Sequence, residues 1–212
     1  MVWVAPTITA YDTHEYRAQM ESIAGFAERV HIDLMDGQFA PTHSPGLEHV
    51  WWPHSVQADI HLMYQLPATA MAKLVELKPH LVVIHAEARV DHSLFAAHLH
   101  KAGIKAGLAL LANTPVEKVE KYLHSFDHVL IFSGKLGYHG GKADLMLLEK
   151  VKAVRYLHHE AEIGWDGGIT SRNAPLLVEL GVDVLNVGGF IMKDPEPEIA
   201  YAKIKEVIGR KK

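Results

Sequence analysis

The stretch HIDLMDG, which begins at His31, places an imidazole and the carboxylate of Asp33 inside an otherwise apolar run. Three later apolar runs also carry a polar side chain near their carboxyl end, at His61, His85 and Asp166. Histidine nitrogens and aspartate oxygens are the ligands that several divalent metal ions prefer. These residues could therefore form a metal site, provided that the fold brings them together.

Short apolar runs rich in β-branched residues alternate along the chain with segments of helical periodicity. We predict eight strands, over residues 2–7, 29–35, 55–63, 80–86, 104–111, 128–133, 161–166 and 183–189. The helical segments after them span residues 13–26, 47–53 (a short turn), 67–77, 91–102, 114–125, 143–157, 171–180 and 195–208. Thr114 and Pro115 are typical of an N-cap and a first helical residue, and Gly103 of a helix end.

Repeated strand–helix units predict a parallel sheet, and eight of them predict a closed α/β barrel, the (β/α)8 TIM barrel. The chain has 212 residues and no linker or low-complexity segment, so we expect residues 1–212 to form one domain. An open, doubly wound sheet is the alternative. Against it, no glycine-rich dinucleotide-binding turn follows the first strand.

The carboxyl ends of the strands of such a barrel meet at one rim, where active sites lie. His31 and Asp33 share one face of their strand, and the residues between them are apolar, so the polar pair is predicted to point toward the barrel axis. His61 and Asp166 would reach the same rim. One such residue alone is more often a satisfied structural group. Four together without partners would be costly to bury, and Zn²⁺, Fe²⁺, Mn²⁺ or Co²⁺ would offset that cost.

The composition excludes several other classes of protein. There is no cysteine, which rules out disulfides and thiolate metal sites. The net charge is −4, without the basic surface of a nucleic-acid-binding protein. No apolar run is long enough to cross a bilayer, and the N-terminus lacks signal-peptide features. We therefore expect a cytoplasmic protein with no nucleic-acid or membrane partner.

The motifs around the polar residues resemble those of the ribulose-phosphate 3-epimerase family. VHIDLMDGQFAP is similar to the family's HVDVMDGxFVPN, and APTITAYD is similar to APSILSAD. The motifs DIHLM (59–63), VIHAEA (83–88), AGIKAGLAL (102–110), NTPVE (113–117) and WDGGI (165–169) follow in the family's order and spacing. The resemblance spans nearly the whole chain and implies a barrel of the ribulose-phosphate-binding type.

The resemblance implies that His31, Asp33, His61 and Asp166 bind one divalent metal ion, with Zn²⁺ as the first expectation. It also implies that Asp33 and Asp166 are the catalytic acid–base pair. Epimerisation beside a carbonyl removes a proton from one face of a carbon and returns one to the other face. The implied reaction interconverts D-ribulose 5-phosphate and D-xylulose 5-phosphate, in the pentose phosphate pathway, by two-base transfer at C3 through a metal-stabilised cis-enediolate.

The resemblance further implies where the substrate binds. Thr7 stands where the family has a serine that touches substrate, and Met35 and Met63 would line the site. Backbone N–H groups of glycine-rich loops would hold the phosphate. The residues expected in these loops are Gly137, His139, Gly140, Gly141, Gly167, Gly168, Gly188 and Gly189. His85 is expected behind the metal ligands rather than among them.

The chain departs from the family in the loops around the substrate. The family's MSVNPGFGGQ is FSGKLGYHGG here, so Phe132 replaces a methionine. The family's AGSAIF is VGGFIM, so Gly189 removes a serine hydroxyl, while Asn186 and Lys142 are additional polar residues expected near the phosphate. The metal motif is kept and the pocket wall is altered.

The altered loops leave two alternatives open. One is an epimerase of another phosphorylated ketose, such as a hexulose 6-phosphate, and the other is a catalytically silent barrel that binds a sugar phosphate or serves as an assembly subunit. A decarboxylase would need DxKxxD where the chain has DLMDG. Family members are commonly dimers or hexamers, so we expect a homo-oligomer, with Trp51 and Trp52 as candidate interface residues.

Overall fold

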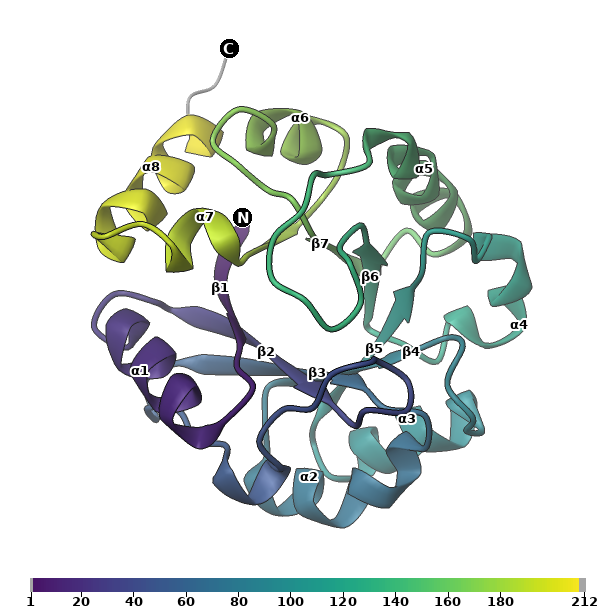
Figure 1. Ribbon diagram of the computed structural model, residues 1–212. Coiled ribbons are helices and arrows are strands. Elements are labelled where there is room, and N and C mark those ends of the chain that lie inside the picture. Colours follow the sequence, from purple (N-terminus) through teal and green to yellow (C-terminus); the bar gives the residue numbers. More distant parts are fainter. Residues whose placement is uncertain (1, 210–212) are drawn as a thin grey trace.

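The computed structural model describes residues 2–209, and eight parallel strands form a closed barrel in chain order with the helices around it (Figure 1). This confirms the predicted TIM barrel. The domain bounds 1–212 stay a prediction, because residues 1 and 210–212 lie outside the described part. Within residues 2–209, no helix has the length and apolar character needed to cross a membrane.

The strands lie close to their predicted positions. They are β1 (Trp3–Thr9), β2 (Arg29–Met35), β3 (Gln57–Met63), β4 (Leu81–His85), β5 (Lys105–Leu110), β6 (His128–Phe132), β7 (Glu162–Asp166) and β8 (Val184–Val187). The last strand is shorter than predicted, because Gly189 already begins a helical turn.

The helices are α1 (Thr13–Ile23), α2 (Met71–Leu77), α3 (His92–Lys101), α4 (Glu120–Leu123), α5 (Leu148–Leu157), α6 (Ala174–Glu179), α7 (Gly189–Met192) and α8 (Pro197–Gly209). Short 3-10 turns occupy Leu47–His49, Pro67–Ala70, Val116–Lys118 and Leu145–Leu147. Only a 3-10 turn therefore separates β2 from β3, and α7 was not predicted at all.

The predicted N-cap at Thr114 is wrong. The segment predicted as one helix over 114–125 forms a 3-10 turn and the short α4, and the turn starts after Pro115 without a side-chain cap. The Thr114 hydroxyl instead donates a hydrogen bond to the carboxylate of Glu87. Gly103, by contrast, follows α3 with a φ of 76°, as a residue at a helix end should.

The barrel has an outer core and a separate interior. Val30, Ile32 and Leu34 of β2 are fully buried in the core between the strands and the helices, which confirms the predicted apolar face. A smaller apolar cluster, Leu81, Val83, Ala109 and Leu130, fills the middle of the interior. Polar side chains occupy both ends of the interior, above and below this cluster.

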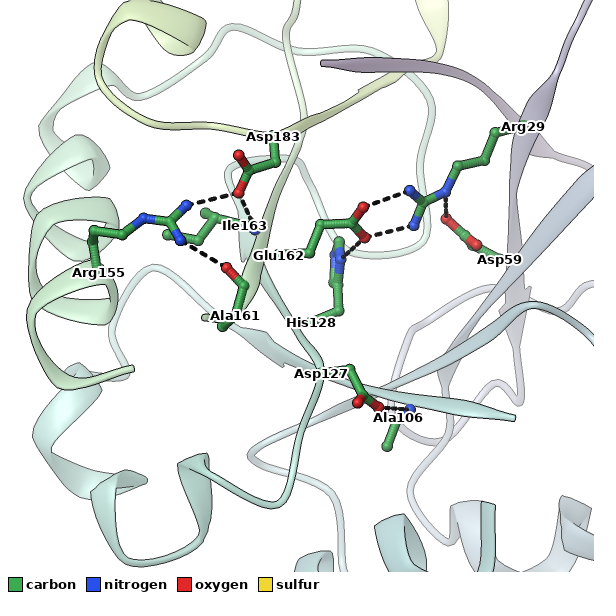
Figure 2. A network of polar contacts seen from close by, with 10 residues as sticks. All are labelled: Arg29, Asp59, Ala106, Asp127, His128, Arg155, Ala161, Glu162, Ile163 and Asp183. Atoms are coloured by element: carbon green, nitrogen blue, oxygen red, sulfur yellow. Dashed lines mark hydrogen bonds and ion pairs between the residues drawn. The ribbon is translucent and has the colours of Figure 1, made fainter. Parts of the chain in front are cut away.

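The amino end of the barrel is closed by a network around Arg29, whose side chain is 1% exposed (Figure 2). The Arg29 guanidinium donates to Asp59 of β3 at 2.7 Å and, through two nitrogens, to Glu162 of β7 at 2.8 Å each. A ring nitrogen of His128, on β6, lies 2.9 Å from the same Glu162 carboxylate. Four strands are thus joined by one buried network. The sequence analysis did not single out these residues, although Arg29 shares a face with His31.

The pKa values of the two carboxylates of this network are shifted in opposite directions. Burial raises the pKa of Asp59 to about 6 despite the neighbouring Arg29. Burial also disfavours the charge of Glu162, but hydrogen bonds from Arg29 and His128 outweigh it, so the pKa of Glu162 falls below its usual range. The folded protein therefore stabilises the charge of Glu162 and disfavours that of Asp59.

We expect Glu162→Gln to lower the free energy of unfolding by about 3 kcal/mol, because it leaves Arg29 poorly paired in the interior. Asp59→Asn should cost about 1 kcal/mol, the value of one hydrogen bond. Urea denaturation at pH 7.5 measures both. The Glu162 charge stabilises the fold fully above its unfolded pKa, near 4.5, and progressively less as the pH falls toward its lower folded pKa. The deficit of Glu162→Gln should therefore shrink as the pH falls below about 4.5. Equal losses in the two variants would contradict this account.

Candidate metal centre and active site

The four residues predicted to bind a metal meet at the carboxyl end of the barrel. His31 and Asp33 come from β2, His61 from β3 and Asp166 from β7, and all four are buried. Each offers one ligand atom, and these atoms all lie within 4.8 Å of one another. Asp33 and His61 are directly paired in the sheet register. The barrel therefore gathers residues that lie up to 135 positions apart in the sequence.

The contacts within this cluster converge on Asp33. Its Oδ1 lies 2.9 Å from Nδ1 of His61 and 3.3 Å from Nε2 of His31. Its Oδ2 accepts a hydrogen bond of 2.8 Å from the hydroxyl of Thr9, on β1. Thr9 was not singled out from the sequence, although it lies two residues after Thr7 on the same face of its strand. Nε2 of His31 also lies 3.9 Å from Oδ2 of Asp166.

Three residues of the cluster have pKa values shifted by burial and by one another. Burial lowers the pKa of His31 to about 4, so its imidazole is neutral, and its Nε2 has no hydrogen-bond partner. Burial and the charge of Asp33 raise the pKa of Asp166 well above its usual range. Burial opposes the charge of Asp33 too, but contacts with His31 and His61 outweigh it and lower its pKa. A divalent cation among these atoms would give the free nitrogen a partner and relieve the repulsion between the carboxylates.

His85 lies behind the cluster, as expected, and links it to a further carboxylate. Nε2 of His85 is 2.9 Å from Nε2 of His61. Its Nδ1 faces Oε2 of Glu87 at 3.5 Å, and neither of these two buried atoms has another hydrogen-bond partner. Burial lowers the pKa of His85 to about 4, so this ring is also neutral. Glu87 was missed, although it follows His85 by two residues.

A cavity of about 290 Å³ opens above Asp33 and Asp166, both of which line it. The predicted substrate-contacting residues that line it are Thr7, Met63, Gly137, His139, Gly140, Gly141, Gly167, Gly168, Gly188 and Gly189. Met35 is not on the wall. It is buried in a small cluster with Met63 and Ala40, and its sulfur lies 3.0 Å from the Thr42 hydroxyl.

The glycine pair after β7 packs against the loop after β6, backbone to backbone. Gly167 and Gly168 have φ values of 113° and 69°. A Cβ on Gly167 would fall 2.2 Å from the nitrogen of Gly134, and one on Gly168 would fall 2.0 Å from the nitrogen of Ala143. Because only glycine fits these positions, this part of the cavity wall is bare backbone.

The loop between β6 and α5 lies over the middle of the barrel in Figure 1. The carbonyl of Gly137 holds it there by accepting hydrogen bonds from the hydroxyls of Tyr11, at 3.3 Å, and Thr42, at 2.8 Å. Phe132, the last residue of β6, lines the cavity, and its ring centroid lies 5.9 Å from that of His61. The altered family loop therefore forms the roof and one wall of the site.

The polar residues that line the cavity differ in part from those predicted from the sequence. Neither Asn186 nor Lys142, which were expected near the phosphate loops, is among the lining residues. Asn186 is buried in β8, and Lys142 is exposed. Lys135, Tyr138 and Lys193 line the cavity instead. Their positions depend on how the loops fold over the barrel, which no local sequence pattern reports.

Comparison with known proteins identifies the family of this chain. The profile of the ribulose-phosphate 3 epimerase family matches residues 3–192. A ribulose-phosphate 3-epimerase from Bacillus subtilis (strain 168) is 29% identical over 221 residues, covering 97% of this chain and 99% of that protein. One from Mycobacterium leprae (strain TN) is 31% identical over 215 residues, covering 97% and 95%.

Solved structures of other enzymes share the fold. A 3-hexulose-6-phosphate synthase from Salmonella typhimurium is similar with a TM-score of 0.74 at 14% identity, over 98% of both chains. A 3-keto-L-gulonate-6-phosphate decarboxylase from Vibrio cholerae has a TM-score of 0.72 at 11% identity, over 99% of this chain and 98% of that one. At such identities the likeness shows the fold alone. The family match covers most of the chain, so this protein belongs to the ribulose-phosphate 3-epimerase family and is an isomerase of the carbohydrate epimerase class.

Proposed function

We propose that the protein interconverts D-ribulose 5-phosphate and D-xylulose 5-phosphate by proton transfer at C3. The observation that carries the proposal is the pair of carboxylates at the base of the cavity. Asp33 and Asp166 come from different strands, lie within 4.8 Å of each other at their ligand oxygens, and both face the space where a substrate would sit. Family membership supports the same reaction.

The two carboxylates would transfer protons on opposite faces of C3. A carboxylate on one side removes the proton, and the electron pair moves toward the neighbouring carbonyl to give an enediolate. The other group, protonated, returns a proton to the opposite face of the carbon, so the configuration is inverted and the proton balance of the pair is kept. In the reverse reaction Asp33 and Asp166 exchange roles.

We infer that His31, Asp33, His61 and Asp166 hold one divalent cation. When bound, it would stabilise the negative charge that develops on the substrate oxygens, as a Lewis acid. The free Nε2 of His31 and the adjacent carboxylates support this set of ligands. Zn²⁺ is our first choice, and Fe²⁺, Mn²⁺ and Co²⁺ suit the same donors.

The lining of the cavity supports a substrate whose phosphate lies away from the two carboxylates. It runs from the two carboxylates to the glycine loops at residues 137–141, 167–168 and 188–189. We propose that backbone N–H groups of these loops bind the phosphate. The buried hydroxyl of Thr7, which also lines the cavity, has no hydrogen-bond partner within the described chain, so it is free to contact the sugar.

A different phosphorylated ketose, such as a hexulose 6-phosphate, is the second candidate substrate. The observation that favours it is the wall formed by Phe132 and the loop with Tyr138 and His139, which differs from the family pattern. A cytoplasmic location and a homo-oligomer, either dimer or hexamer, stay predictions. Trp51, 38% exposed, remains a candidate interface residue.

Replacing Asp33 or Asp166 by Asn should lower turnover by roughly 10³-fold, since each variant lacks one of the two proton-transfer groups. A coupled assay with D-ribulose 5-phosphate and a panel of ketose phosphates, in added Zn²⁺ or Mn²⁺, measures this and ranks the substrates. Hydrogen–deuterium exchange at C3 should fall in parallel. Asp91→Asn is a matched control, because Asp91 caps α3 at the surface. Turnover close to wild type in both site variants would defeat the two-base mechanism.

The chain of contacts behind His61 yields a second prediction. For His61 to offer Nδ1 to a cation, its proton must lie on Nε2 and be donated to His85, whose own proton then lies on Nδ1 and faces Glu87. Glu87→Gln removes the carboxylate that selects this tautomer. We expect the apo-protein to bind Zn²⁺ or Co²⁺ about 10- to 100-fold more weakly, by calorimetry or chelator competition. Thr114→Val, which removes only a hydroxyl from Glu87, should have a smaller effect. Unchanged affinity in Glu87→Gln would contradict this assignment.

A further inference from the structure

Lys193, the residue directly after α7, lies along the glycine-lined end of the cavity. A Cβ placed on Gly189 would lie 3.9 Å from both Cδ and Cε of Lys193, and one placed on Gly140 would lie 3.7 Å from its Nζ. The lysine stem therefore runs past Gly189, and the ammonium reaches the loop that follows β6. One side chain spans two of the three glycine loops.

The ammonium of Lys193 has no partner within residues 2–209: neither an ion pair nor a hydrogen bond engages it there. The other lysine that lines the cavity is different. The Nζ of Lys135 lies 4.3 Å from the centre of the Tyr138 ring, in a cation–π contact. Lys193 is thus the lysine of this wall whose charge is available for a ligand.

The charges of the cavity are arranged with opposite signs at its two ends. Asp33 and Asp166 line one end, and Lys193 lies at the other among glycines that carry no side-chain donor of their own. Backbone N–H groups hold an anion by hydrogen bonds, but they bring no net positive charge. An ammonium beside them would strengthen the binding of a dianion, because charge-assisted hydrogen bonds are roughly twice as strong as neutral ones.

We propose that Lys193 binds the phosphate group of the substrate and so determines which end of the sugar phosphate faces Asp33 and Asp166. The identity of the sugar rests on the proposed function, whereas the anion site rests only on the geometry around Lys193.

The test uses inorganic phosphate as the probe and three variants of the full chain. Lys193→Met keeps the length of the stem and removes the charge, while Lys193→Arg keeps the charge. Lys203→Met, on the exposed face of α8, removes a charge far from the cavity as a control. Calorimetry at pH 8 should show phosphate binding weakened about tenfold in Lys193→Met, largely kept in Lys193→Arg, and unchanged in Lys203→Met.

The KM and kcat for D-ribulose 5-phosphate provide a second test of the proposal. Lys193 contacts the phosphate equally in the ground state and the transition state, so Lys193→Met should raise KM about tenfold with little change in kcat. Phosphate affinity and KM both equal to wild type, in a Lys193→Met protein with a normal circular dichroism spectrum, would overturn the proposal and leave the epimerase function standing. Absence of phosphate binding by the wild-type protein would overturn it too. Lys193-dependent phosphate binding without epimerase activity on any ketose phosphate would uphold the anion site and refute the proposed function.

Discussion

Every second side chain of each strand points into the interior of the closed barrel. A polar side chain there must therefore form its hydrogen bonds or ion pairs with residues of other strands. On β2 these inward residues are Arg29, His31 and Asp33, in successive layers. A charge in such a space is costly unless another strand supplies its counterpart. The partners come from Asp59 and Glu162 at the amino end, and from His61 and Asp166 at the carboxyl end. The register of the strands therefore decides which charges meet.

The two ends of the barrel balance their charges in different ways. At the amino end, the permanent cation of Arg29 forms ion pairs with Asp59 and Glu162 (Figure 2). At the carboxyl end, two carboxylates lie beside the imidazoles of His31 and His61, and no lysine or arginine approaches within ion-pairing distance of them in residues 2–209. A divalent cation and a substrate would complete that end. The two ends therefore differ in whether the described chain itself supplies a counter-charge for the buried carboxylates.

The loops after the strands form the walls of the cavity above Asp33 and Asp166. Gly167 and Gly168 press against the loop after β6, which Tyr11 and Thr42 hold over the barrel through the carbonyl of Gly137. Those contacts leave backbone, rather than side chains, on much of the cavity wall. Phe132 and Lys193 are among the side chains that give the rest of the wall its shape and charge. The two parts of the site are not independent, because the Phe132 ring also lies against the rings of His61 and His85.

The sequence by itself determined the features that follow from local periodicity. Alternation along β2 placed His31 and Asp33 on the inward face, and the count of strand–helix units determined the barrel. The same rule would have placed Arg29 inward, but its partner Glu162 lies 133 residues away. The tertiary structure alone decided that pairing, the use of Thr114 by Glu87 rather than by a helix, and the position of Lys193 beside Gly140. Such contacts join residues from different βα units, so they exist only once the barrel has closed and its loops have packed over the rim.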